Sequence, residues 1–201
     1  KAIKETSNLV IKYRNQPINS FYHGSNGGIT ATASESWKMR DYPYFKTVID
    51  GSRSLKDSFK VPILKTSELN KFLDLQVGDF YGNNHALFRW ERKISGFTIA
   101  DNLMRNKLID KIGNVVDFKI TERGLSGRVT KLEITIDSSS KPIVLVKDDI
   151  RRILSFLPSN LFIINKLNDD LWFFEGGGFG HGVGLSQAGA IEMAELGFTY
   201  E

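Results

Sequence analysis

One stretch, residues 176–190 with the sequence GGGFGHGVGLSQAGA, constrains the fold of this chain more than any other. Six of its first nine residues are glycine, His181 lies among them, and Ser186 and Gln187 follow. Glycine loses the most backbone entropy on folding, so clustered glycines indicate positive φ angles or close backbone approach. Residues 188–196 are small and apolar, which predicts a short helix. Exposed N–H groups before a helix suit a polar or anionic ligand, whereas a tight turn with His181 buried is the alternative.

A second glycine-containing segment lies near the start of the chain, at residues 21–37, with the sequence FYHGSNGGITATASESW. It holds another histidine, His23, followed by small polar residues and a Gly-Gly pair. A β-turn with Gly27 and Gly28 at positive φ explains this pattern without any ligand.

The two segments together resemble the SpoIID/LytB domain family, which comprises stage II sporulation protein D and amidase-enhancer proteins. The family pattern is a glycine-rich run, GHGVG, a hydrophobic residue, SQ, a GA pair, and MA before a Gly and a Tyr. Residues 180–200 reproduce it as GHGVGLSQAGAIEMAELGFTY. A Ser-Gly-Arg turn before a strand, here within residues 124–134, is a further likeness. A dinucleotide site is excluded, because no strand–turn–helix–strand unit with a downstream acid follows the glycines.

The resemblance implies an α+β fold with a core rich in antiparallel sheet, short helices and an inserted α+β lobe. We expect one domain over residues 1–201, with a core formed by residues 1–54 and 157–201 and a lobe at about residues 55–156. The two motif segments are expected to meet across one cleft.

Hydrophobic periodicity and turn residues predict the secondary structure along the chain. A helix within residues 57–78 is expected to start with Thr66 or Ser67 as its N-cap and to bury Leu69, Phe72 and Leu73. Further helices are expected at residues 99–112 and 147–156, the latter with Asp148 or Asp149 near its start. Strands are expected at residues 9–13, 17–22, 80–92, 115–123, 128–137, 161–167 and 171–175.

The family likeness implies work on peptidoglycan. SpoIID proteins resemble lytic transglycosylases, which cut the bond between N-acetylmuramic acid and N-acetylglucosamine and leave a 1,6-anhydro sugar. That reaction needs one carboxylic acid with a raised pKa, and no second carboxylate, because the sugar supplies its own nucleophile. The alternative is a non-catalytic cell-wall binding module, or an enhancer of an N-acetylmuramoyl-L-alanine amidase.

The catalytic residue is unknown from the sequence. The catalytic glutamate of the family lies in an N-terminal pattern that matches nothing in this chain. Glu35 and Glu175 lie near the two motifs, and one of them could take its place. Tyr22 or Trp37 could stack on sugar rings. The expected substrate-binding residues are Tyr22, His23, Ser25, Asn26, Gly27, Gly28, Thr30, Gly180, His181, Gly182, Gly184, Ser186 and Gln187.

The amino-acid composition limits which partners and cofactors are expected. The net charge is +4 with both signs interspersed, so nucleic-acid binding is not expected. There is no cysteine, which excludes disulfides and thiolate metal sites. Two histidines alone make a poor zinc site, so no metal or cofactor is expected, and His85 is interpreted as a surface or edge residue.

The expected partners are peptidoglycan glycan strands and other cell-wall hydrolases. No apolar run approaches a membrane span, so no membrane contact is expected from this segment. The family likeness implies an exported protein of the cell envelope or periplasm. The chain begins at Lys1 and its first methionine is Met39, which predicts a processed product or a piece of a longer protein.

Overall fold

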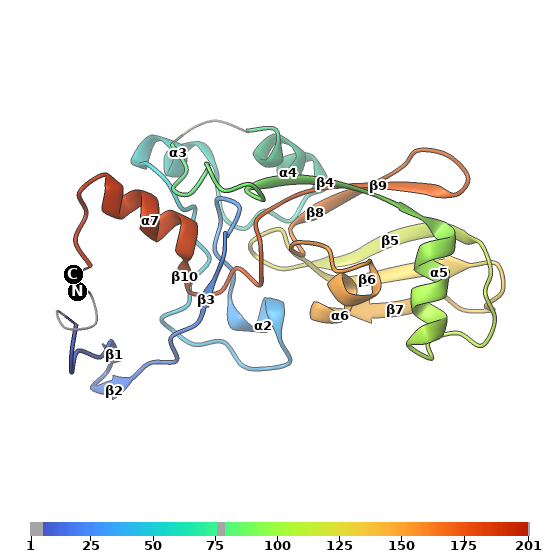
Figure 1. The fold of residues 1–201 in the computed structure, drawn as a ribbon, viewed down its shortest axis with the longest axis horizontal. Helices are drawn as coiled ribbons and strands as arrows, with labels where there is room; N and C mark the ends of the chain where they lie inside the picture. The colour runs from blue at the N-terminus through green and yellow to red at the C-terminus, as the bar shows by residue number, and fades with distance from the viewer. Residues whose placement is uncertain (1–5, 76–78, 201) are drawn as a thin grey trace.

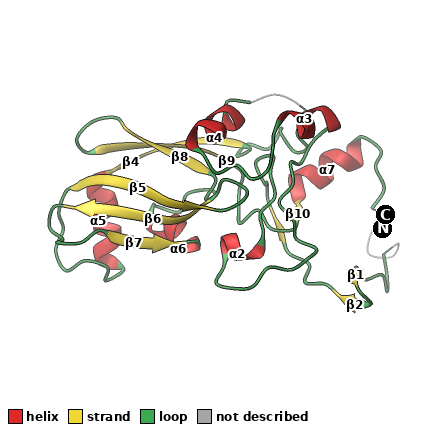
Figure 2. Cartoon of the chain, turned by 180° about the vertical axis from the view of Figure 1, so that it is seen from behind, coloured by secondary structure: helices red, strands yellow, loops and turns green. Residues whose placement is uncertain are grey.

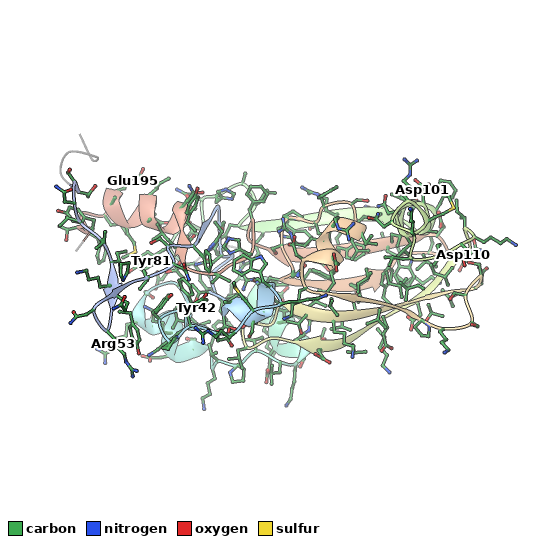
Figure 3. The ribbon with its side chains drawn as sticks, turned by 90° about the horizontal axis from the view of Figure 1, so that it is seen from below. Tyr42, Arg53, Tyr81, Asp101, Asp110 and Glu195 are labelled. Carbon is green, nitrogen blue, oxygen red and sulfur yellow. The ribbon has the colours of Figure 1, made fainter. Side chains whose placement is uncertain are left out.

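The computed structural model describes residues 6–75 and 79–200. The fold is α+β, as expected, and elongated, with two three-stranded antiparallel sheets at one end and shorter elements around α7 (Gln187–Glu195) at the other (Figure 1). Figure 3 shows the labelled Glu195 of α7 and Asp101 of α5 (Gly96–Arg105) at opposite ends of the molecule. The long axis therefore separates the sheets from the motif that ends in α7.

The first sheet has the strand order β4-β9-β8. Its strands are β4 (Arg89–Ser95), β9 (Leu171–Gly177) and β8 (Phe162–Lys166), all antiparallel. Trp90 and Phe162 flank Gly176 across the sheet. The central strand β9 thus delivers the chain directly into the glycine-rich segment.

The second sheet has the order β5-β6-β7, from β5 (Val115–Arg123), β6 (Val129–Ile136) and β7 (Ile143–Val146). The predicted antiparallel pairing of residues 115–123 with 128–137 is confirmed, with Phe118 opposite Ile134. Figure 2 shows the two sheets layered with α5 behind them. Buried apolar residues of both sheets, α5 and α6 (Asp148–Ile153) form the largest core cluster, which includes Ile99, Leu132 and Phe174.

A second core cluster lies beneath α4 (Thr66–Leu73). The predicted apolar stripe Leu69, Phe72 and Leu73 is buried there. These side chains pack with Ile29, from the first motif segment, and Leu161, which precedes β8. The stripe is therefore part of the hydrophobic core, and it packs against Ile29 of the first motif segment.

The elements near the N-terminus are short. They are β1 (Lys12–Tyr13), β2 (Gln16–Pro17), β3 (Tyr22–His23), α2 (Ala33–Ser36) and α3 (Arg53–Ser58). β1 and β2 form the expected hairpin, but each strand is only two residues long. The predicted strand at residues 17–22 is wrong over most of its length, because residues 18–21 do not belong to a strand.

Several predicted boundaries are wrong for local reasons. The helix expected within residues 57–78, from Thr66 or Ser67 onward, is α4, which ends at Leu73, whereas residues 57 and 58 belong to α3. Pro62, between the two helices, cannot donate a helical hydrogen bond; residues 76–78 lie outside the described part. The N-cap of α4 is Lys65 instead of Thr66 or Ser67, whereas α6 begins at Asp148, as expected. The strand expected at residues 80–92 begins only at Arg89, after a series of turns.

The division into core and lobe stays a prediction. The β4-β9-β8 sheet joins residues 89–95 of the expected lobe to residues 162–177 of the expected core. Any boundary between the two parts must therefore cross a hydrogen-bonded sheet.

Candidate functional site

The two glycine-containing segments lie side by side. β3 pairs in parallel with β10 (Leu185–Ser186), with Leu185 opposite Tyr22. Ser25 and Phe179 exchange two backbone hydrogen bonds of 3.1 and 2.7 Å. Residues more than 150 positions apart in the chain thus lie side by side (Figure 1). We call residues 22–30 and 179–187 together the joined segments. Their adjacency is as the resemblance implied.

Two glycines explain why the contact is so close. Gly27 has φ +68°, and a Cβ there would lie 2.6 Å from the carbonyl carbon of Gly177. Gly184 has φ +77°, and a Cβ there would lie 2.1 Å from the backbone oxygen of Phe21. Backbone packs directly on backbone at both points, which only glycine permits.

Most polar side chains of the first segment are used inside the fold. The Asn26 side chain accepts a hydrogen bond from the Gly28 N–H at 2.8 Å and donates one to Asp50 at 2.5 Å. Ser25 Oγ accepts from the Gly27 N–H at 3.3 Å. The side chains of Ser25 and Asn26 are buried, so they shape the loop rather than face solvent.

A buried arginine, Arg128, lies beneath both segments. Its guanidinium donates to the carbonyls of Asn26 at 2.9 Å and Ile29 at 3.1 Å. A Cβ on Gly182 would lie 2.4 Å from that guanidinium, so the second segment lies directly over it. Burial lowers the pKa of Arg128 to about 10, opposed by the nearby charge of Glu35. The Ser-Gly-Arg turn was the sequence signal for this residue, but its role was not inferable from it.

The two histidines pack against each other, with ring centroids 5.3 Å apart. His23 is 4% exposed, and its Nδ1 donates to the Val183 carbonyl at 3.1 Å. His181 is half-buried, and its Nδ1 accepts from the Val183 N–H at 3.0 Å. Burial lowers the pKa of His181, and Arg128 and Arg151 lower it further, against a hydrogen bond with the Tyr22 backbone. Both rings are therefore neutral, and their hydrogen bonds with Val183 hold the two loops in place.

A bulky side chain from the first segment packs against His181. Its ring centroid lies 4.6 Å from that of Trp37, which in turn packs on Phe21 at 5.1 Å. Trp37 thus packs against both rings, so less of its own ring is free to stack on a sugar than the sequence indicated. Tyr22, by contrast, is 64% exposed.

The His23 pKa gives a testable dependence of stability on pH. Burial lowers this pKa from 6.5 to about 3, and Arg128 acts in the same direction. Between those two pH values the unfolded chain binds the proton and the folded chain does not, so the free energy of unfolding falls as the pH falls. We expect a loss of about 2 kcal/mol between pH 7 and pH 5 from this group.

Urea unfolding of the wild type and His23→Asn at both pH values measures the effect. Asparagine can still donate to the Val183 carbonyl but does not titrate, so the variant should lack this part of the pH dependence. An equal loss in both proteins would contradict the assignment.

Glu35 is a structural carboxylate. It is 4% exposed and follows Thr32, the N-cap of α2, with which it forms a capping box. Its oxygens accept from the Ser126 hydroxyl, from the Ser126 N–H at 3.3 Å and from Thr47 at 3.2 Å. Both carboxylate oxygens are therefore occupied by donors of the protein itself, whereas a general acid must present its proton to the bound substrate. The arrangement therefore disfavours Glu35 as a stand-in for the catalytic acid.

Glu175 lies in a different cleft, of about 310 Å³, between α4 and the β4-β9-β8 sheet. It is opposite Glu91 on the neighbouring strand and accepts a hydrogen bond from Asn165 at 3.2 Å. Residues 22–30 and 180–187 contribute nothing to the lining of this cleft. Glu35 lines a separate groove, to which residues 22–30 and 180–187 also contribute nothing, so neither acid named from the sequence shares a cleft with them.

The polar residues at the end of the second segment are partly used inside the fold as well. Ser186 is the N-cap of α7, is buried, and accepts from the Gly189 N–H at 3.3 Å. The next residue, Gln187, is exposed at the first turn of that helix. Thr30 is half-buried and accepts from the Val48 N–H at 2.9 Å. The roles of all these residues in binding substrate stay predictions.

Two further findings concern the described part of the chain. No group of three or more His, Asp or Glu side chains there is placed to hold a metal ion. No helix there is both long and apolar enough to cross a membrane.

Comparison with known proteins finds a curated relative and a family model that match this chain. The amidase enhancer of Bacillus subtilis (strain 168) is 25% identical over 217 aligned residues, which cover 100% of this chain. The chain spans 30% of the length of that relative. A family model described as a domain of unknown function (DUF8618) matches residues 31–184, which include α2, both sheets and most of the glycine-rich segment. The chain therefore belongs to the DUF8618 family.

Proposed function

We propose that this chain is a non-catalytic peptidoglycan-binding module that enhances a cell-wall amidase in the cell envelope. The observation that carries the proposal is the pairing of β3 with β10, which leaves Tyr22 and Gln187 exposed at and just after the paired strands, while Glu35 and Glu175 line other clefts. The likeness to an amidase enhancer over the whole chain supports the same choice.

The exposed surface of the joined segments has the chemistry of a sugar site. Tyr22 offers an amphipathic ring, and Leu185 beside it is also exposed. Gln187 offers both a donor and an acceptor. Sites for uncharged ligands combine an apolar surface with a few placed polar groups, and these residues meet that description.

Glycan cleavage of the lytic transglycosylase type is the competing function. It requires an acid that reaches the bound glycan, and Glu35 and Glu175 are both placed unfavourably for that role. We therefore expect the chain to bind glycan strands without generating anhydro-muramic ends.

The experiment has three readouts on the same protein. Binding is measured by co-sedimentation with purified peptidoglycan sacculi, and cleavage by mass spectrometry of peptide-free glycan strands. Enhancement is measured as release of stem peptides by an N-acetylmuramoyl-L-alanine amidase with and without the chain. Binding with enhancement and no anhydro ends is the expected result. Anhydro ends lost in Glu35→Gln or Glu175→Gln would establish cleavage instead, and no effect on any readout would refute the proposal.

Two substitutions separate the binding surface from its framework. Tyr22→Ala removes an exposed ring, so we expect a threefold to tenfold loss of glycan affinity, or about 0.5–1.5 kcal/mol, with little change in stability. His181→Ala leaves the buried Val183 N–H without its acceptor, so we expect a loss of about 1–3 kcal/mol of stability.

Thermal unfolding and glycan affinity of both variants are measured side by side. In His181→Ala the affinity of the folded protein should change less than in Tyr22→Ala. The reverse pattern, with stability unchanged and affinity lost in His181→Ala, would make His181 a contact residue.

A further inference from the structure

A pocket of about 330 Å³ lies beside the joined segments, at the start of α7. We propose that it holds the acetamido group of an N-acetylated sugar in the bound glycan, an inference that rests on the proposed glycan binding. Its lining residues are Gly24, Asn84, His85, Gln187, Ala188 and Ile191.

The walls of the pocket are fixed to one another. The Ala188 N–H donates to the Gly24 carbonyl at 3.0 Å, which joins α7 to the first motif segment. The turn that carries Asn84 and His85 is held on α7 by a hydrogen bond from the Gly82 N–H to the Glu192 carboxylate. A Cβ on Gly82 would lie 2.6 Å from the Gly189 nitrogen, so this turn is in backbone contact with the helix. The pocket is therefore preformed.

His85 presents a defined donor to this pocket. Its Nδ1 accepts a hydrogen bond from the Leu87 N–H at 3.0 Å, so in the neutral ring the proton is on Nε2. The ring also stacks on exposed Phe179, with centroids 6.3 Å apart and planes at 21°. The interpretation of His85 as a plain surface residue is thus incomplete, because the sequence did not show that the turn folds against α7.

The lining suits an acetamide in three respects. Ala188 and the 60% exposed Ile191 offer an apolar wall for the methyl group. The Nε2–H of neutral His85 can donate to the acetamide carbonyl. The side-chain oxygens of Asn84 and Gln187 can accept from its N–H.

The charge of the pocket distinguishes it from the other cavities. None of the described residues that line it is Asp, Glu, Lys or Arg. The cleft beside Glu175 is lined also by Asp74, Arg89 and Glu91, and a groove of about 390 Å³ above Glu35 includes Glu122, Arg123 and Lys131. Because those cavities carry charge and this one does not, the neutral acetamide fits here best.

The test compares two uncharged β-1,4-linked oligosaccharides of equal length, chitohexaose and cellohexaose, by calorimetry. They differ only at C2, where one carries an acetamido group and the other a hydroxyl. We expect the full chain to prefer chitohexaose at least tenfold. His85→Asn keeps an acceptor for the Leu87 N–H but lacks the Nε2 donor, so it should reduce that preference threefold to tenfold and leave cellohexaose binding unchanged.

A charge-matched pair tests the apolar wall. Ile191→Asp should abolish the preference, because it places a carboxylate at the methyl site. Val144→Asp, at a 49% exposed position on β7 in the distant sheet, should not change it (Figure 1). Circular dichroism confirms that each variant is folded.

Three results would overturn the inference. Equal affinity of the wild type for the two oligosaccharides refutes it while leaving glycan binding intact. A preference retained in both His85→Asn and Ile191→Asp would show that the acetamido group binds at another site. Failure of the wild type to bind either oligosaccharide or sacculi refutes the proposed function and this inference together.

Discussion

Replacing Glu35 with alanine is expected to reduce the free energy of unfolding by about 3–5 kcal/mol. The carboxylate is buried and accepts from Ser126, Thr47 and the Thr32 backbone. Its removal leaves these donors without a partner and removes the negative charge nearest to the fully buried Arg128. Chemical denaturation of the wild type and the variant measures the difference.

Two controls make the result specific. Glu68→Ala, at an exposed position in the first turn of α4, should change stability by less than about 1 kcal/mol. Glu35→Gln should fall between the two, because an amide oxygen accepts some of the same bonds. An unchanged stability in Glu35→Ala together with lost activity on glycan would instead identify Glu35 as a catalytic acid.

Replacing Gly184 with alanine is expected to reduce the free energy of unfolding by more than about 3 kcal/mol and to separate β3 from β10. The new Cβ would lie 2.1 Å from the Phe21 oxygen, which is backbone and cannot rotate away. The φ of +77° adds strain of its own. The melting temperature and the binding to sacculi should therefore both decrease.

Gly197→Ala separates the two causes. Gly197 has φ +90°, and a Cβ there would have nothing within 4 Å, so this variant carries the dihedral strain alone. We expect it to lose about 1 kcal/mol. Equal effects at both positions would show that the contact with Phe21 is accommodated, and the joined segments would then be less tightly constrained than the geometry indicates.

Local patterns were sufficient where the physical cause is local. The alternation in residues 115–137 predicted the β5-β6 pair, because successive side chains of a strand point to opposite faces. The spacing of Leu69, Phe72 and Leu73 predicted a buried helix face. The start of α4 was less predictable, because it begins after Lys65, which makes no capping hydrogen bond.

The adjacency of the two glycine-containing segments came from resemblance, and no local pattern contains it. β3 and β10 are each two residues long, too short to be recognised from periodicity. Their pairing depends on backbone contacts at Gly27 and Gly184, between residues far apart in the chain. Only the folded chain shows which of the motif side chains are then buried and which, like Tyr22, remain exposed.

The sequence by itself determined the main strands and the glycines that allow close approach, because these follow from side-chain period and backbone freedom, whereas the α+β class came from the resemblance. The tertiary structure alone decided the roles of Glu35, Arg128 and His85. Whether a carboxylate is a catalytic acid or a cap depends on the donors around it, and those of Glu35 include Ser126, 91 residues away. Burial and hydrogen bonding between distant residues set the chemistry of an ionisable group, and neither is encoded in its sequence neighbours.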